Sequence, residues 1–155
     1  MINRLLLCLA FLISLSACSK SYKLSVLSSE VVSERPVSTI GPEEENEADK
    51  KWKKYDVLIK GDIVNYLRSS TSTFRAEITN CAENNISTDE FYVNSLSMDS
   101  IRNGGSISNE NISGGTKASV YVSSEILLNN RSLCMYGRGG SMLGATVRTN
   151  EVRLK

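Results

Sequence analysis

Alternation of apolar and polar residues from Tyr55 onward constrains the fold of this chain more than any other feature. In residues 73–79, Phe74, Ala76 and Ile78 alternate with polar neighbours, which places the three apolar side chains on one face of an extended strand. The polar residues between them then face the opposite side. This pattern is typical of a half-buried β-strand.

The same alternation recurs in short segments separated by polar and glycine-rich turns, and Gly61 stands where a turn or bulge is expected. The further candidate strands are 55–59, 63–66, 91–98, 118–128, 133–136, 143–147 and 152–154. In this part of the chain, only 123–130 is a candidate for a short helix. Several short strands within roughly a hundred residues predict an all-β fold, a small antiparallel β-sandwich that is Ig-like or barrel-like.

The first seventeen residues have the composition of a secretory signal. A basic start at Arg4 precedes nine consecutive apolar residues, from Leu5 to Ile13. This run is too short to span the apolar core of a bilayer, which takes about twenty residues. We therefore expect export, with residues 1–17 as the signal peptide, and no transmembrane anchor.

The signal ends in Leu15, Ser16, Ala17 and Cys18, a run that resembles the lipobox of bacterial lipoproteins. The resemblance implies cleavage before Cys18, a diacylglycerol thioether on its sulfur and acylation of the new amino terminus. Ser19, where an aspartate would favour retention in the inner membrane, implies an outer-membrane protein that faces the periplasm. An ordinary cleaved signal with a chance cysteine is the alternative. The covalent lipid is the only cofactor expected.

Residues 18–54 are predicted to form a flexible tether between the lipid and a folded domain, 55–155. They contain both prolines, many serines and the charged run 43–54. Such a stretch buries too little apolar surface to offset the entropy lost on ordering. It is either a spacer or an extension with no length requirement, and the charged run could also support one short helix.

Two cysteines, Cys81 and Cys134, remain in the expected domain. In an exported protein such a pair most often forms a disulfide. A metal site at these thiols lacks its usual further ligands, because the chain contains no histidine. The bridge would close a loop of about fifty residues and contribute about 4 kcal/mol in the chain-entropy estimate.

Charge and composition exclude several functions. The chain has 18 basic and 17 acidic residues, and loss of the signal removes only Arg4 from them. A nearly neutral chain without a basic stripe does not predict nucleic-acid binding. The absence of histidine excludes Ser/His/Asp, Cys/His and imidazole-zinc sites. Carboxylate pairs and serine/lysine dyads stay open in principle, but no such constellation is visible, so we do not expect an enzyme.

A glycine-rich segment, 137–144, is one candidate for partner contacts. It matches neither the dinucleotide fingerprint nor the nucleophile elbow, because Met142 and Leu143 stand where those patterns require glycine. We expect a hairpin connection between two strands here. If the connection is a recognition loop, Arg138 and Met142 offer a charge and an adaptable apolar contact.

The long polar stretch 102–116 is the other candidate for partner contacts. Loops of this length are either mobile connections or binding elements. Arg102, Ile107 and Ile112 are the residues that a partner would contact. The two isoleucines could equally form a short edge strand.

A lipid anchor, a disulfide and a β-rich domain together indicate a membrane-anchored module that binds a protein partner. This layout of signal, tether and sandwich is similar to the lipoprotein immunity proteins that protect the periplasm from phospholipase effectors of type VI secretion. The resemblance implies inhibition, in which the domain occludes the effector beside the membrane. The alternatives are a secretion-system assembly lipoprotein, such as a pilotin or outer-membrane anchor, and a carrier of a small molecule or lipid.

Overall fold

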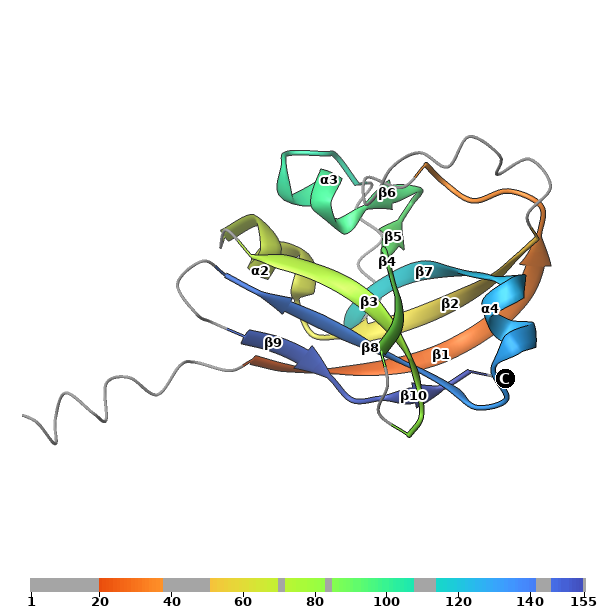
Figure 1. Cartoon of the computed structure of the whole chain (residues 1–155). Helices are drawn as coiled ribbons and strands as arrows, with labels where there is room; N and C mark the ends of the chain where they lie inside the picture. Colours follow the sequence, from red (N-terminus) through yellow and green to blue (C-terminus); the bar gives the residue numbers. More distant parts are fainter. Residues whose placement is uncertain are drawn as a thin grey trace, which may run out of the picture.

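The computed structural model describes residues 20–37, 51–69, 72–82, 85–107, 114–141 and 146–154. Strands in these ranges form one curled sheet of order β4-β3-β8-β9-β1-β2-β7-β5-β6, with β10 paired to β8 (Figure 1). The strands are β1 (Lys20–Val32), β2 (Trp52–Lys60), β3 (Thr73–Asn80), β4 (Asn85–Asp89), β5 (Tyr92–Val93), β6 (Leu96–Ser97), β7 (Gly115–Ser123), β8 (Leu133–Gly140), β9 (Thr146–Thr149) and β10 (Val152–Arg153). The helices are α2 (Ile63–Ser69), α3 (Met98–Arg102) and α4 (Ser124–Asn129).

Strand β1 belongs to both walls of the curled sheet. Its first residues, Lys20–Tyr22, pair in parallel with β9, whereas Lys23–Val32 pair antiparallel with β2. One wall therefore consists of β4, β3, β8 and β9, and the other of β2, β7, β5 and β6. The walls curl toward each other like half of a barrel, with β1 at their junction (Figure 1).

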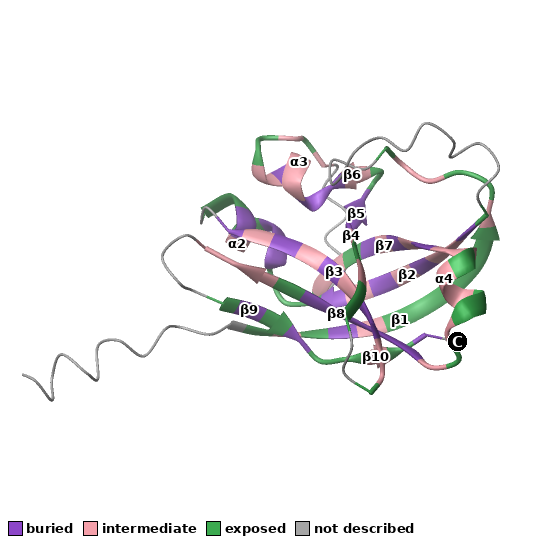
Figure 2. Ribbon diagram, viewed as in Figure 1, coloured by how far each residue is buried: buried purple, intermediate pink, exposed green. Residues whose placement is uncertain are grey.

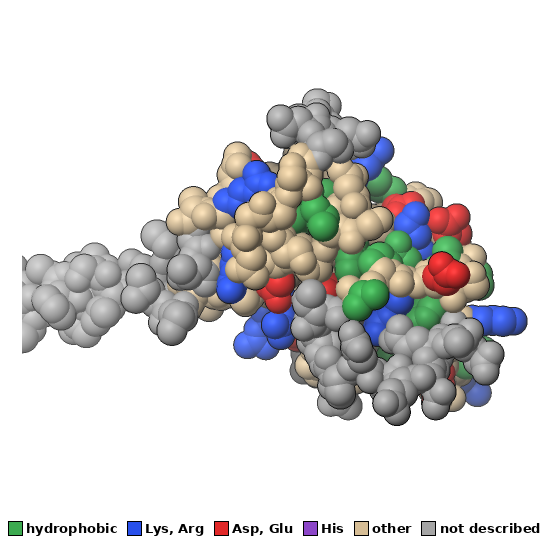
Figure 3. All heavy atoms as spheres, turned by 90° about the horizontal axis from the view of Figure 1, so that it is seen from above, with side chains coloured by type: hydrophobic (Ala, Val, Ile, Leu, Met, Phe, Trp, Pro, Cys, Tyr) green, Lys and Arg blue, Asp and Glu red, His purple; other side chains and the backbone are tan. Residues whose placement is uncertain are grey.

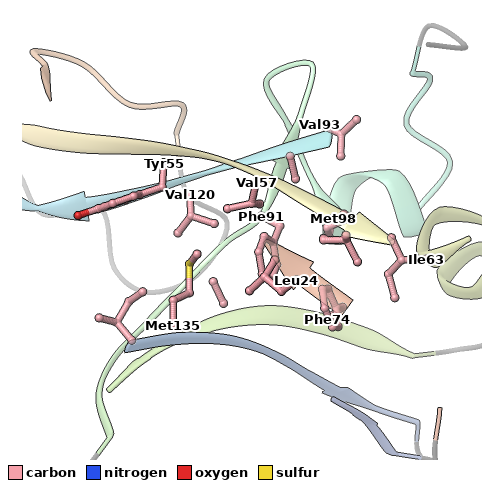
Figure 4. Packing of buried hydrophobic residues seen from close by; sticks show 14 of the residues in the cluster. Leu24, Tyr55, Val57, Ile63, Phe74, Phe91, Val93, Met98, Val120 and Met135 are labelled. Atoms are coloured by element: carbon pink, nitrogen blue, oxygen red, sulfur yellow. The ribbon is translucent and has the colours of Figure 1, made fainter. Parts of the chain in front are cut away.

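The core lies between the two walls, where the buried positions of the alternating strands meet (Figure 2). Val57 from β2 and Val120 from β7 lie across the core from Met135 on β8 (Figure 4). Phe74 stacks on Phe91, with 5.0 Å between the ring centroids. Each such buried side chain contributes roughly 1.5–3 kcal/mol relative to an exposed one, so this interior is the main stabilising feature of the domain.

The glycines of β8 are required by close packing against β3. A Cβ atom on Gly137 would overlap the ring of Phe74, and one on Gly139 would overlap a backbone carbonyl of β3. The hairpin expected at 137–144 is confirmed, since β8 and β9 pair antiparallel, but β8 itself includes the first glycines of that segment. Residues 142–145, which include most of the connection, lie outside the described residues.

Most of the predicted strands are confirmed, with shifted ends, as β2, β3, β7, β8, β9 and β10. The strand expected at 63–66 is wrong, because this segment begins helix α2. Ile63, Val64 and Leu67 lie on one helical face and are buried, and Asp62 accepts a hydrogen bond from the backbone N–H of Asn65 (3.2 Å). The apolar residues of this segment are spaced as in a helix, but four residues are too few to show that spacing.

Three further elements refine the sequence-based expectations. The strand expected at 91–98 is divided into β5 and β6 by a tight turn, in which Asn94 and Ser95 have φ values of 51° and 67°. Helix α4 confirms the helix expected within 123–130. Strand β4 and helix α3 were not expected, and β4 lacks an apolar alternation because it lies at the edge of the sheet with mostly exposed side chains.

The flexible tether expected at 18–54 is wrong where the structure describes it. Most of its first part is β1, the longest strand of the sheet, and its end belongs to β2. Leu24 is only 1% exposed, since β1 lies at the junction of the two walls. The serine-rich composition concealed the alternation of Tyr22, Leu24 and Val26. The sheet therefore begins at Lys20 and not at residue 55.

Cys81 and Cys134 form the expected disulfide, with their Cα atoms 5.0 Å apart. It joins the segment after β3 to β8, where Thr79 is the register partner of Cys134. The predicted fold class is confirmed as mostly β and disulfide-stapled, and of the two predicted architectures the barrel-like one is closer. The sheet is mixed and not purely antiparallel, since β1 and β9 pair in parallel. Parallel pairing is possible here because most of the chain, and not a short hairpin, connects these two strands.

Candidate functional site: an open strand edge

After Leu24, no strand among the described residues pairs with one edge of β1. The ladder with β9 ends at Tyr22, and the side-chain amide of Asn150 takes the next position. Leu24 N donates to Asn150 Oδ1 (2.8 Å), and Asn150 Nδ2 donates to Leu24 O (3.1 Å). Beyond this point β1 pairs with β2 alone, and Figure 1 shows β1 and β10 diverging.

The hydrogen bonds of β2 establish which backbone groups of β1 face the open side. Gly61 N donates to Gly114 O, and Ser124 N donates to Lys51 O, both on the side of β7. Because the backbone N–H and C=O groups of successive residues point to opposite sides of a strand, those of the odd-numbered residues of β2 point toward β7. The N–H and C=O groups of the even-numbered residues of β2 therefore point toward β1 and form the hydrogen bonds between the two strands.

The strand register then identifies the open positions on β1. Val26, Ser29 and Val31 each lie opposite an odd-numbered residue of β2. Their N–H and C=O groups therefore point away from β2, in the direction that Leu24 uses to reach Asn150. Donors and acceptors at alternate positions of a strand edge are the groups that pair with an added strand.

A β-bulge at Leu27 divides this edge. Val26 and Ser28 are opposite consecutive residues of β2, so Leu27 is the extra residue. A bulge shifts the alternation by one position and increases the local twist. Bulges also limit indiscriminate pairing of exposed edges, so the partner strand must fit the shape of this one.

Apolar side chains lie along the same strand. Val26, Leu27 and Val31 are 37%, 49% and 69% exposed. The face seen in Figure 3 likewise carries hydrophobic side chains among charged ones. Exposed apolar residues beside unpaired backbone groups are typical of a surface that binds another chain.

Helix α4 carries further apolar residues at the same end of the sheet. Val32, Trp52 and Ser123 are successive register partners on β1, β2 and β7, and α4 begins directly after Ser123. None of its residues is fully buried, and Leu128 is strongly exposed. The open edge and an apolar helix therefore occupy the same end of the wall.

A polar network covers the outer face of β1, β2 and β7. Asp56 accepts hydrogen bonds from Ser119 Oγ (2.7 Å) and Ser28 Oγ (3.1 Å), and Lys54 Nζ lies 3.3 Å from Asp56 and 3.0 Å from Glu30. Burial raises the pKa of Asp56, but these hydrogen bonds and the lysine charge outweigh it and lower the pKa overall. The hydrogen bond to Glu30 raises the pKa of Lys54, which therefore stays protonated and is no base for these serines.

The structure places the predicted contact residues on different elements. Arg102 ends α3, Ile107 is half-buried against the core, and Arg138 lies on the outer face of β8 near Glu77. In the described part of the chain, no hydrogen bond or ion pair joins Arg102 to Arg138. The predicted residues outside the described ranges are Cys18, Ile112 and Met142.

The described residues contain neither a metal site nor a membrane-spanning helix. No group of three or more His, Cys, Asp or Glu residues in these ranges could hold a metal ion. No helix in the same ranges has the length and apolar character needed to cross a membrane. Comparisons with family models, curated proteins and solved structures gave no match for this chain.

The open edge could be predicted only in part from the sequence. The alternation of Tyr22, Leu24 and Val26 was an available signal for a strand within the serine-rich segment. Which side of that strand is open depends on where β9 ends, and β9 lies near the other end of the chain. No local pattern contains that information.

Proposed function

We propose that this protein is a lipid-anchored binding module that takes an extended segment of a partner protein as an added strand on β1. The open backbone groups of Val26, Ser29 and Val31 carry this proposal. Strand addition draws affinity from main-chain hydrogen bonds and selectivity from neighbouring side chains. The exposed apolar side chains of β1 supply the selectivity.

Within this proposal, the lipid on Cys18 holds the domain at the periplasmic face of the outer membrane. The partner is a phospholipase effector of type VI secretion, which the domain inhibits by occlusion. An anchored inhibitor has a high effective concentration at the surface that such an enzyme attacks. The domain itself performs no catalysis in this proposal.

A competition experiment tests the proposed binding edge. A strain that lacks the gene is complemented with wild type, Val31→Pro or Val37→Pro and is challenged by an attacker that delivers the effector encoded beside the gene. Proline at position 31 removes an outward N–H and obstructs strand addition, so we expect loss of protection. Val37 is also an exposed valine but lies beyond β1, so its variant should still protect.

Two outcomes would contradict the proposal. Equal survival of the deletion strain and the wild type would reject the immunity function. Full protection by Val31→Pro, at a membrane level equal to wild type, would reject the binding edge.

The anchor has its own test. Cys18→Ala should lose labelling by radioactive palmitate and leave the membrane fraction. Retention of both would show that the lipid is not attached to Cys18.

A further inference from the structure

Three arginines are direct neighbours on three adjacent strands of the other wall. Arg75 on β3 is the register partner of Arg138 on β8, and Arg138 is the register partner of Arg148 on β9. Arg75 and Arg148 alternate with buried residues of β3 and β9, so they lie on the outer face, and their register partner Arg138 lies on the same face. With neighbouring strands about 5 Å apart, the row spans about 10 Å.

Such a row is unfavourable for folding by itself, because like charges directly opposite each other destabilise a sheet. Each arginine has an acidic partner. The distances are 3.4 Å for Arg75–Asp99, 3.7 Å for Arg138–Glu77 and 3.3 Å for Arg148–Glu151. The row is therefore charge-compensated in total, and the surface that it presents depends on which partner lies outermost.

In every pair the arginine is more exposed than the acid. Arg138 is 66% exposed and Glu77 only 13%, and Arg148 is 64% exposed against 45% for Glu151. Arg75 is likewise more exposed than Asp99. The outer surface therefore presents guanidinium groups, while the carboxylates of Glu77 and Asp99 are largely covered.

A tyrosine fixes the middle of this row. Tyr136 Oη donates a hydrogen bond to Glu77 Oε2 (2.5 Å). This bond occupies one carboxylate oxygen and fixes the position of the carboxylate. The guanidinium of Arg148 lies over the Tyr136 ring, 4.7 Å from its centroid. This contact orients the guanidinium while leaving most of its donors available.

The row also continues to the start of β1, because Ser21 is the register partner of Arg148. Only Ser19 separates Cys18 from the first residue of β1. If Cys18 carries the lipid, as the proposed function holds, the membrane surface lies beside this end of the sheet and not at the end of a long tether.

We propose that Arg75, Arg138 and Arg148 contact the headgroup phosphates of anionic lipids and hold the outer face of β3, β8 and β9 against the membrane. Guanidinium groups bind phosphate oxygens through paired hydrogen bonds. Basic residues are attracted to an anionic membrane surface. Because this contact holds one wall of the sheet against the membrane, it also sets the position of the open β1 edge relative to the membrane.

Chemical modification of arginine tests this contact in the acylated protein. The protein is reconstituted in vesicles of phosphatidylcholine alone or with 30% phosphatidylglycerol (about a third anionic lipid, enough for a strong surface potential), and phenylglyoxal modification is measured at each arginine by mass spectrometry. Arg131 is the internal control, because it is exposed and precedes the opposite end of β8. Modification of Arg138 and Arg148, relative to Arg131, should slow at least several-fold in the anionic vesicles.

The same ratio in both vesicles would overturn the membrane contact. Slowing by inorganic phosphate in neutral vesicles, to the same extent as by phosphatidylglycerol, would instead identify a site for free phosphate and also overturn it. The mass of the Cys18 peptide reports acylation separately. A failed anchor and a failed contact are therefore distinguishable in one sample.

Discussion

The side chain of Asn150 pairs with the backbone of Leu24 as a strand residue would, accepting from its N–H and donating to its C=O. Backbone groups that lose their partners in a part-buried position cost about 1–3 kcal/mol. We therefore expect Asn150→Ala to lower the free energy of unfolding by about 1–3 kcal/mol in urea denaturation. Asn129→Ala, on the exposed end of α4, should change it by less than about 0.5 kcal/mol. Equal effects of the two substitutions would contradict a special role for this pair.

The open edge predicts different effects of proline at two neighbouring positions. Proline at Val31 removes an N–H that points outward, so the unfolding free energy should fall by less than about 1 kcal/mol. Proline at Glu30 removes an N–H that faces Lys54 on β2 and should cost about 1–3 kcal/mol more. Glu30→Gln isolates the side-chain contribution. If Val31→Pro proves as costly as Glu30→Pro, the assignment of the open positions is wrong.

The disulfide predicts a large loss of stability on removal. Its cysteines are 53 residues apart, and closure of a loop of this length contributes about 4 kcal/mol in the chain-entropy estimate. The double substitution Cys81→Ser with Cys134→Ser should therefore lower the free energy of unfolding by about 2–4 kcal/mol. Mass spectrometry of non-reduced peptides should show the two residues linked. Two free thiols in protein purified without reductant would contradict the bond.

The Asp56 network predicts a dependence of stability on pH. The pKa of Asp56 is lower in the folded protein than its ordinary value of 3.8. Its contribution is therefore fully present above the pKa of the unfolded chain and is lost as the pH falls through the lower folded pKa. Asp56→Asn should flatten the decline of stability below about pH 4, measured by urea denaturation at several pH values.

Glu34→Gln is the control for this experiment, because Glu34 is exposed and lies beyond β1. It should leave the acid dependence unchanged. An unaltered decline in the Asp56→Asn protein would show that other carboxylates cause it.

The arginine row predicts a small effect of charge removal on stability. Arg138 lies between two like charges, and Glu77 is its own ion-pair partner. We expect Arg138→Gln to change the unfolding free energy by less than about 0.5 kcal/mol, since the loss of an exposed ion pair is balanced by relief of repulsion. A loss of several kcal/mol in thermal or chemical denaturation would make the row a structural feature and remove the argument for an interaction surface.

Local patterns predicted the elements that bury one side against the core. In β3, Phe74, Ala76 and Ile78 are buried while the residues between them are not, as the alternation requires. The disulfide followed from export and from the lack of any other partner for Cys81 and Cys134. These inferences needed no knowledge of which strands are neighbours.

The remaining features depend on contacts between distant parts of the chain. The serine-rich residues of β1 become a strand because β2 and β9 both pair with them. The open edge and the row formed by Arg75, Arg138 and Arg148 arise from register, which no single segment encodes. The strand that carries the candidate site could therefore be predicted from its weak alternation, but the open side of that strand could not.

The two pairings of β1 also impose an order of assembly on the chain. Its hydrogen bond to Asn150 joins residues 126 positions apart, so this part of β1 cannot complete its pairing until Asn150 has been synthesised. Such long-range contacts form slowly, and an unpaired strand is prone to aggregation in the meantime. The N-terminal strand is therefore the first strand of the described domain to be made and among the last to find all its partners.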